Sequence, residues 1–319
     1  MITRSSRREF LKRSSLLFTG IGTASLLNKA TGTLYAADNA TVAVVKNESA
    51  IDDNNKCNSE EAANMITKGL TAITGQNDVG DAWRALGLTK QDVVAIKVNC
   101  NRAGFLLNAH PELVYALCES MSAIIPENNI IIYDRDTTEL TQVGFVGNTS
   151  SSGVRCFGSE NAGGFDNEDE LTDIVFNQCT KLINLPSLKT FEREYAGTLC
   201  LKNQIGTLRR DHMSRCHGNT PFITEVNARP SIRDKTMLIL CDGLRGTYQR
   251  STPWYYKGII MSTDPIATEV TCLGIINEKR KAESIEEMPI PNYVTLADTK
   301  YGLGISDTSN ITTLLQTMS

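Results

Sequence analysis

A lysine inside an apolar run is the first feature of this 319-residue sequence that indicates chemistry. Lys97 lies within VVAIKV (residues 93–98), and lysine is almost never fully buried unless it is paired. Two interpretations stay open. The side chain either reaches water at the edge of a sheet, or it pairs with a nearby carboxylate such as Asp134 or Asp242.

Polar residues follow each of the predicted apolar strands. In open α/β sheets, ligands bind beyond the carboxyl ends of the strands, so these groups would converge on one rim if the strands are parallel. The alternative is that Asp and Asn end strands because they make turns. The residues that we predict to bind a ligand at this rim are Lys97, Asn99, Lys189, Lys202, Asn203, Asp242 and Asp264.

A second polar cluster spans residues 198–217 and contains two of the three histidines. In a helix, His212 and Cys216 would share one face at a spacing of four residues. With His217 and an acid from elsewhere, such as Asp242, they predict a mixed-ligand metal site. Two alternatives remain: a solvated basic segment, or an anion pocket made with basic side chains that include Lys189, Lys202, Arg209 and Arg210.

Common catalytic signatures do not show whether these residues form a metal site, an anion pocket or a solvated segment. The sequence has no HExxH, GxSxG, P-loop or GxGxxG pattern, so none of those classes is indicated. His110, directly before Pro111, is interpreted as a capping or loop histidine at the start of a helix.

The elements that must position these residues alternate between strands and helices. Near-continuous apolar strands separated by helices predict an α/β fold, a mainly parallel sheet with helices on both faces. We expect a single domain over residues 38–319, with a loop-rich insertion near residues 144–170; two α/β lobes are the alternative. Near the C-terminus, we expect a strand over residues 293–296 and a helix over residues 312–318.

The first 37 residues have the order of an export signal: a basic start, an apolar run over residues 14–27, and the small-residue end Tyr35-Ala36-Ala37. Ser6-Arg7-Arg8-Glu9-Phe10-Leu11-Lys12 resembles the twin-arginine motif. We therefore expect the twin-arginine translocation machinery to be a partner, and the protein to be periplasmic or otherwise extracytoplasmic. An uncleaved signal would instead anchor it to the membrane. After removal of the signal, no apolar run is long enough for a transmembrane span.

Net charge and cysteine spacing limit which partners and cofactors are expected. Residues 38–319 hold 26 basic and 35 acidic side chains. Such an acidic body repels phosphate backbones, so nucleic acid is not an expected partner. The nine cysteines form no CxxC pair, so no ferredoxin-type cluster is expected. The cofactor stays open, with a metal ion as one candidate.

Several segments in order resemble the domain-of-unknown-function family 362. The resemblance runs from about residue 92 to residue 304. Its pieces are VAIKVN (94–99), HPELV (110–114), INLPSLKT (183–190), GTLCLKNQIG (197–206), His217-Gly218, Asp242-Gly243, TDPIA (263–267) and YGLG (301–304). Some members carry an added ferredoxin-like segment with clustered cysteines, which this sequence lacks. The resemblance therefore implies little about the reaction, but it includes most of the residues picked at the strand ends.

Three functions follow from these patterns. The first is an exported enzyme or redox protein with a metal or anionic-ligand site at the rim. The second is a non-catalytic periplasmic protein that binds a small anionic ligand or assists the maturation of another exported protein. In the third, the polar groups only stabilise turns and helix ends.

Overall fold

A mixed sheet of eight strands forms the centre of the computed structural model, which describes residues 38–101, 107–190, 198–217, 220–249 and 252–318. These residues belong to one compact unit. The strand order is β10-β1-β9-β6-β5-β2-β3-β4, and only β9 runs against the other strands. The strands are β1 (Ala40–Asn47), β2 (Val94–Lys97), β3 (Ile130–Tyr133), β4 (Arg155–Cys156), β5 (Lys181–Asn184), β6 (Thr236–Gly243), β9 (Gly258–Ser262) and β10 (Ile311–Met318). Two further strands, β7 (Gly246–Gln249) and β8 (Thr252–Trp254), pair only with each other.

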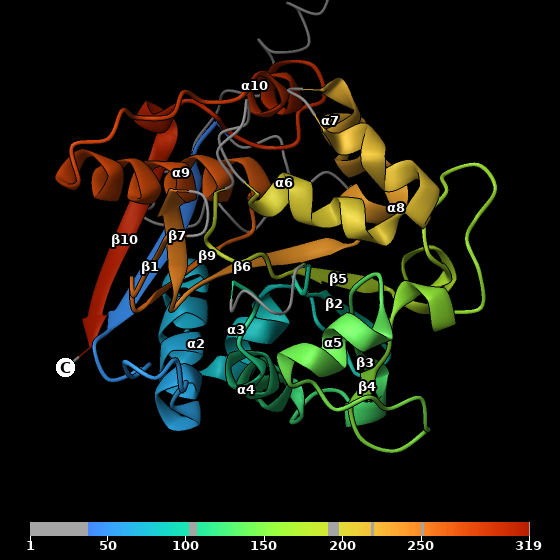
Figure 1. Cartoon of the computed structure of the whole chain (residues 1–319). Helices are drawn as coiled ribbons and strands as arrows, with labels where there is room; N and C mark the ends of the chain where they lie inside the picture. Colours follow the sequence, from blue (N-terminus) through green and yellow to red (C-terminus); the bar gives the residue numbers. More distant parts are fainter. Residues whose placement is uncertain (1–37, 102–106, 191–197, 218–219, 250–251, 319) are drawn as a thin grey trace, which may run out of the picture. The chain divides into compact units, whose positions relative to one another are not determined.

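Helices cover both faces of the sheet, so the prediction of an α/β fold is confirmed (Figure 1). One face carries α2 (Ser59–Thr74), α3 (Val79–Ala85), α4 (Pro111–Met121) and α5 (Thr137–Val143). The other face carries α6 (Cys200–Asn203), α7 (Pro221–Asn227), α8 (Pro230–Arg233), α9 (Pro265–Ala282) and α10 (Asn292–Thr299). The short helical turns are η2 (Glu127–Asn129), η3 (Ser159–Asn161), η4 (Ile174–Gln178), η5 (Gln204–Thr207), η6 (Arg210–Cys216) and η7 (Thr308–Asn310).

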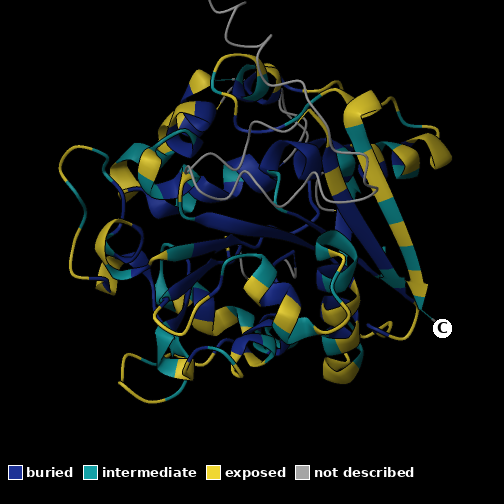
Figure 2. Cartoon of the chain, turned by 180° about the vertical axis from the view of Figure 1, so that it is seen from behind, coloured by how far each residue is buried: buried dark blue, intermediate teal, exposed yellow. Residues whose placement is uncertain are grey.

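The central strands are buried on both faces, as Figure 2 shows. This explains why β2, β3 and β6 are apolar runs without polar alternation: each face packs against helices. The covering helices have one apolar face. In α2, for example, Ile66 and Leu70 are buried, Asn58 caps the start by accepting from the N–H groups of Glu60 and Glu61, and Gly75 ends the helix in the left-handed region at φ 69°.

Two expected elements near the C-terminus are wrong. The expected strand at residues 293–296 lies inside α10, where Tyr293 and Val294 pack against the core. The expected helix at residues 312–318 is strand β10, which pairs in parallel with β1 along its whole length. Neighbouring strands override a weak local preference, and the Ile-Thr-Thr start of β10 suits a strand.

The region near residues 144–170 is rich in loops, and its regular elements are β4 and η3. No described helix is both long and apolar enough to cross a membrane. The expected signal, residues 1–37, lies outside the described residues.

Candidate functional site

Four parallel strands, β3, β2, β5 and β6, bring their carboxyl ends to the same edge of the sheet. Lys97 is the last residue of β2, Asp134 directly follows β3, Asn184 ends β5, and Asp242 lies near the end of β6. All four are buried. With Asn99, His110, Lys189 and Asn203 they form what we call the rim cluster.

Lys97 forms a buried ion pair. Its side chain is 2% exposed, and its Nζ lies 2.7 Å from Asp134 Oδ1 and 2.7 Å from the carbonyl oxygen of Val98. Since β2 lies between β5 and β3, the lysine is not at a sheet edge, and pairing with a carboxylate is the correct alternative. Backbone N–H groups hold Asp134 in turn: Cys100 donates to Oδ2 at 2.6 Å and Arg135 donates to Oδ1 at 2.8 Å.

The backbone of η5 packs directly onto this ion pair at Gly206. A Cβ atom at this position would lie 2.6 Å from both Cε and Nζ of Lys97, and 2.8 Å from Asp134 Oδ1. Real Cβ atoms essentially never approach other atoms so closely. A side chain at this position would therefore have to displace the Lys97 ammonium or the Asp134 carboxylate.

Two asparagines, Asn203 and Asn99, connect Lys97 to the second lysine of the cluster, and the Asn203 amide donates to the Lys97 carbonyl oxygen at 3.0 Å. Asn203 donates to the Asn184 Oδ1 at 2.8 Å, and its own Oδ1 accepts from Asn99 at 3.2 Å. Asn99 Oδ1 accepts from Lys189 Nζ at 2.6 Å, and the same ammonium donates to the carbonyl of Leu107 at 3.0 Å. These two contacts of Lys189 are with neutral oxygens, which position its ammonium group.

His110 and Asp242 form the other charged pair of the cluster. Asp242 Oδ2 accepts from the backbone N–H of His110 at 2.8 Å and lies 2.8 Å from the ring Nδ1. Because an ionised carboxylate only accepts hydrogen bonds, Nδ1 must carry the hydrogen and Nε2 is the site that gains or loses a proton. Nε2 faces Asn55 Oδ1 at 3.4 Å. Burial lowers the pKa of His110, but the adjacent Asp242 carboxylate raises it by more, so the net shift is upward.

The chemistry available to the rim cluster follows from its charges. The rim cluster contains two lysines, Lys97 and Lys189, a histidine that can be protonated, His110, and two acidic residues, Asp134 and Asp242. Buried ammonium groups attract anions because the surroundings screen charge weakly. A histidine oriented by a carboxylate can act as a general acid or base.

Two of the predicted ligand-binding residues lie elsewhere. Asp264 follows β9, which runs antiparallel, so it lies at the opposite edge of the sheet. There it caps α9, accepting from the N–H groups of Ile266 and Ala267, and also accepts from Ile305. Lys202 follows Cys200 and Leu201 in α6, near Cys216 and Glu269; burial lowers the pKa of its ammonium.

The predicted metal ligands do not converge. Within the described residues, no three His, Cys, Asp or Glu side chains are placed to hold a metal ion. Cys216 is buried while His217 is exposed, and His212 Nδ1 pairs with Glu170 Oε2 at 2.5 Å. The segment is the 3₁₀ helix η6, with about three residues per turn, so residues four apart do not share a face as they would in an α-helix.

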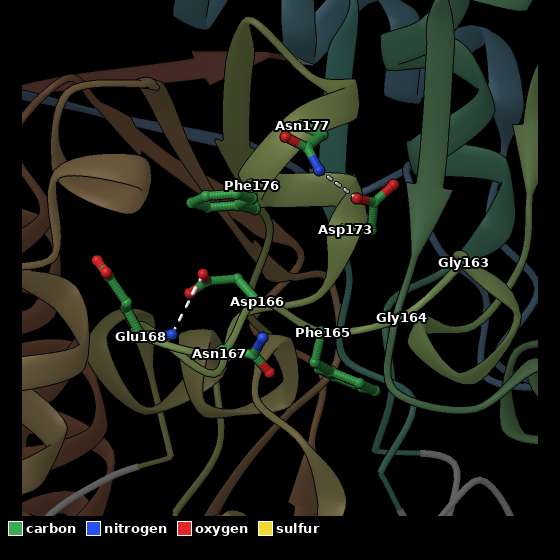
Figure 3. A pocket seen from close by; sticks show the side chains of 9 residues that line it. All are labelled: Gly163, Gly164, Phe165, Asp166, Asn167, Glu168, Asp173, Phe176 and Asn177. Atoms are coloured by element: carbon green, nitrogen blue, oxygen red, sulfur yellow. Dashed lines mark hydrogen bonds between the residues drawn. The ribbon is translucent and has the colours of Figure 1, made fainter.

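A cavity of about 510 Å³ lies in the loop-rich region, outside the rim cluster (Figure 3). Its carboxylates are Asp166, Glu168 and Asp173. Asp166 accepts from the backbone N–H of Glu168 at 3.2 Å, and Asp173 accepts from the Asn177 amide at 2.5 Å. Such a lining repels anions, so the cavity is not a candidate for the ligand class that the rim cluster favours.

Comparison with protein families decides the relationship of this chain to others. Residues 94–274, more than half of the chain, match the family described as "Domain of unknown function (DUF362)". The chain belongs to this family. In this DUF362 protein the match begins at β2, which carries Lys97, and ends within α9. Searches among curated proteins and among solved structures gave no match.

The DUF362 match contains the whole rim cluster, including three residues that sequence reasoning left out of the predicted set. Asp134 and Asn184 stand at strand ends, the signal that identified their neighbours. His110 was interpreted as a cap, yet its side chain makes no capping hydrogen bond and its ring turns to Asp242 instead. A histidine before proline carried no signal for that partner, which is 132 residues away in the sequence.

Proposed function

We propose that this DUF362 protein binds a small anionic ligand, a carboxylate or a phosphate ester, at the rim cluster, and that His110 transfers a proton there. The observation that carries the proposal is the burial of two lysines and a His–Asp pair at the same edge of the sheet. Burying charges costs free energy, and charged groups held in this way are typical of binding and catalytic sites.

Each charged residue has a role in this proposal. Lys189 supplies a charge that attracts the anion, and Asn99 Oδ1 and the Leu107 carbonyl oxygen position its ammonium. The Lys97–Asp134 pair fixes the ends of β2 and β3 beside it. Asp242 keeps the His110 hydrogen on Nδ1, so that Nε2 is the atom that exchanges a proton with the ligand.

The second candidate is a non-catalytic protein that binds the same class of anion. Hydrogen bonds to backbone groups favour this second candidate, because they hold Asp134, Lys189 and Asp242 in place. His110→Gln separates the two candidates. The variant still binds the anion through Lys189 under both, with some loss of affinity where His110 is protonated, and it loses turnover only if His110 transfers a proton.

We expect Lys189→Met to weaken anion binding at least tenfold. An ammonium that donates to a charged ligand contributes about 1.5–3 kcal/mol, and tenfold corresponds to about 1.4 kcal/mol. The measurement is thermal unfolding at constant ionic strength with inorganic phosphate, acetate, succinate or glycerol phosphate added in place of chloride. At least one of these probes should raise the melting temperature of the wild type in a saturable way.

The matched control is Lys68→Met, which removes the same charge from an exposed position on α2. It should retain the full ligand response. The proposal fails if no probe gives a saturable response in the wild type, or if Lys189→Met responds to the same concentrations as the wild type does.

We also propose that residues 1–37 direct export through the twin-arginine machinery. The support is the motif Ser6-Arg7-Arg8-Glu9-Phe10-Leu11-Lys12 and the apolar run after it. Replacing Arg7 and Arg8 with lysine should abolish export while keeping the charge, and cell fractionation followed by immunoblotting measures this. The double replacement of Arg4 and Arg13 with lysine is the matched control and should be exported. Cytoplasmic retention of the wild type, or export of both variants alike, would refute the proposal; an exported chain that keeps its full length in the membrane fraction would show an anchor.

A further inference from the structure

Strand β10 leaves one edge of the eight-stranded sheet open among the described residues. It pairs with β1 residue for residue from Ile311 to Met318, without a bulge, and it is the outermost strand of the sheet (Figure 1). Figure 2 shows the same strand with exposed and half-buried residues along its length. Its second row of backbone N–H and C=O groups therefore has no strand partner within the part of the chain that the structure describes.

This edge lacks the features that usually protect edge strands. Proteins protect such strands with charged residues, proline, bulges or short length, because an open edge is a template for pairing with another strand. The sequence of β10, ITTLLQTM, contains no charge and no proline, and its eight residues exceed the usual strand length of about 5–6. Leu315 is 62% exposed near its centre.

We propose that β10 pairs with β10 of a second copy of this chain, in antiparallel orientation about a two-fold axis perpendicular to the sheet. A rotation about such an axis leaves each residue on its own face. Directly opposite residues must then lie an even number of positions apart along the strand sequence, or be the same residue in the two copies.

The register centred on Leu315 is self-complementary on the exposed face. It places Leu315 opposite Leu315 of the second copy and Thr313 opposite Thr317 on both sides. All three residues are exposed in the single chain. Leucine then meets leucine and threonine meets threonine, which are favourable cross-strand pairs. The match between the strand and its own reversed copy is the reason to choose a second copy as the occupant.

Charge also favours this edge as the contact. Residues 38–319 carry more acidic than basic side chains, so two copies have the same sign of net charge and repel each other at long range. An eight-residue strand without charge is a place where two such copies can approach closely. The dimer joins two eight-stranded sheets into one continuous sheet and covers the open edge of both.

The first test is sedimentation equilibrium of the full chain. We expect a dimer for the wild type and at least a tenfold rise in the dimer dissociation constant for Leu315→Lys, which places two like charges opposite each other. The matched control is Val146→Lys, since Val146 is also an exposed apolar residue, at 70%, but lies between α5 and β4 at the other end of the sheet order. It should stay dimeric. Equal melting temperatures for Leu315→Lys and the wild type, both measured at concentrations where they are monomeric, would show that Leu315→Lys folds.

A cross-linking experiment tests the register independently. Directly opposite residues have Cβ atoms about 4.5–5.5 Å apart, so Leu315→Cys should form an intermolecular disulfide when diamide is added as the oxidant. A mixture of Thr313→Cys and Thr317→Cys should form a mixed disulfide far faster than either variant forms one with itself. The native cysteines do not interfere, because all nine are buried. Val146→Cys is the matched control and should run as a monomer on a non-reducing denaturing gel.

The outcomes separate the possible occupants. A monomeric wild type, or a dimer that Leu315→Lys leaves intact, would overturn the proposal. Protection of Leu315→Cys from thiol reagents in a monomer would show instead that the chain's own residues 1–37, which lead into β1, cover the edge. A cross-link at Leu315→Cys together with dissociation by Leu315→Lys supports the two-fold pairing.

Discussion

Asp134→Ala is expected to lower the free energy of unfolding by about 3–5 kcal/mol, the usual cost of breaking a buried ion pair by removing one partner. The replacement leaves the Lys97 ammonium, with a side chain 2% exposed, without its carboxylate. It also removes the acceptor of the Cys100 and Arg135 N–H groups, at 2.6 Å and 2.8 Å. Urea unfolding followed by circular dichroism measures the change.

The chain provides a matched control in a second Asp ion pair. Asp81 lies 2.8 Å from Arg84, almost the same distance as in the Lys97–Asp134 pair, but both side chains are more than half exposed. Exposed pairs contribute about 0–1 kcal/mol, so Asp81→Ala should cost far less than Asp134→Ala. The double variant Lys97→Met/Asp134→Leu, which removes both charges, should recover the part of the loss that comes from the unpaired ammonium, but not the part that comes from the Cys100 and Arg135 N–H groups. Equal costs for Asp81→Ala and Asp134→Ala would contradict the burial of the Lys97 pair.

The sequence predicted that Lys97 could be paired with a carboxylate, but it did not predict which one. The apolar run around Lys97 was sufficient to predict that it is buried and paired or lies at an edge. Choosing between Asp134 and Asp242 requires the strand order. Since β3 is the neighbour of β2 and Lys97 is opposite Tyr133, the next residue, Asp134, comes within reach. Asp242 lies on β6, beyond β5, and meets His110 instead.

The misplaced residues have physical causes of the same kind. Asp264 follows an apolar strand just as Asp134 does, but the sequence of a buried strand does not encode its direction, and β9 is antiparallel. His212 and Cys216 have the spacing of one α-helical face, yet the segment forms a 3₁₀ helix. For Asp264 the strand-end pattern was correct and the direction of β9 decided its contacts, whereas for His212 and Cys216 the local helix type itself differed from the expected one.

Glu269 is expected to make stability fall as the pH rises from about 5 to 7. This carboxyl lies on α9 and is 2% exposed. Its Oε2 accepts from the backbone N–H of Leu201 at 2.9 Å, and its Oε1 accepts from the Tyr293 hydroxyl at 3.4 Å. Burial raises the pKa of Glu269 from its ordinary 4.5 to about 7, because the charged form loses its hydration, and the hydrogen bonds offset this only in part.

The sign follows from proton counting. Between the ordinary pKa and the raised one, the folded state holds a proton on Glu269 that the unfolded state has released. Stability therefore falls as the pH rises through this range, by about 3 kcal/mol in total at about 1.4 kcal/mol per pH unit. Two other groups act in the same direction. Burial raises the pKa of Asp264 to about 6, and Asp242 raises that of His110 against the effect of burial.

Glu269→Gln isolates the contribution of Glu269, because glutamine keeps the shape and an acceptor oxygen but does not titrate. The free energy of unfolding, measured in urea at half-unit steps from pH 5 to 8, should fall less steeply for this variant than for the wild type. Glu278→Gln is the matched control: it makes the same change at an exposed position of the same helix and should follow the wild-type profile. Parallel profiles for Glu269→Gln and the wild type would mean that this carboxyl is already ionised in the folded protein at pH 5. In that case the Leu201 N–H and Tyr293 hydroxyl would outweigh the cost of burial, and Glu269 would stabilise the fold as a charged acceptor joining α6, α9 and α10.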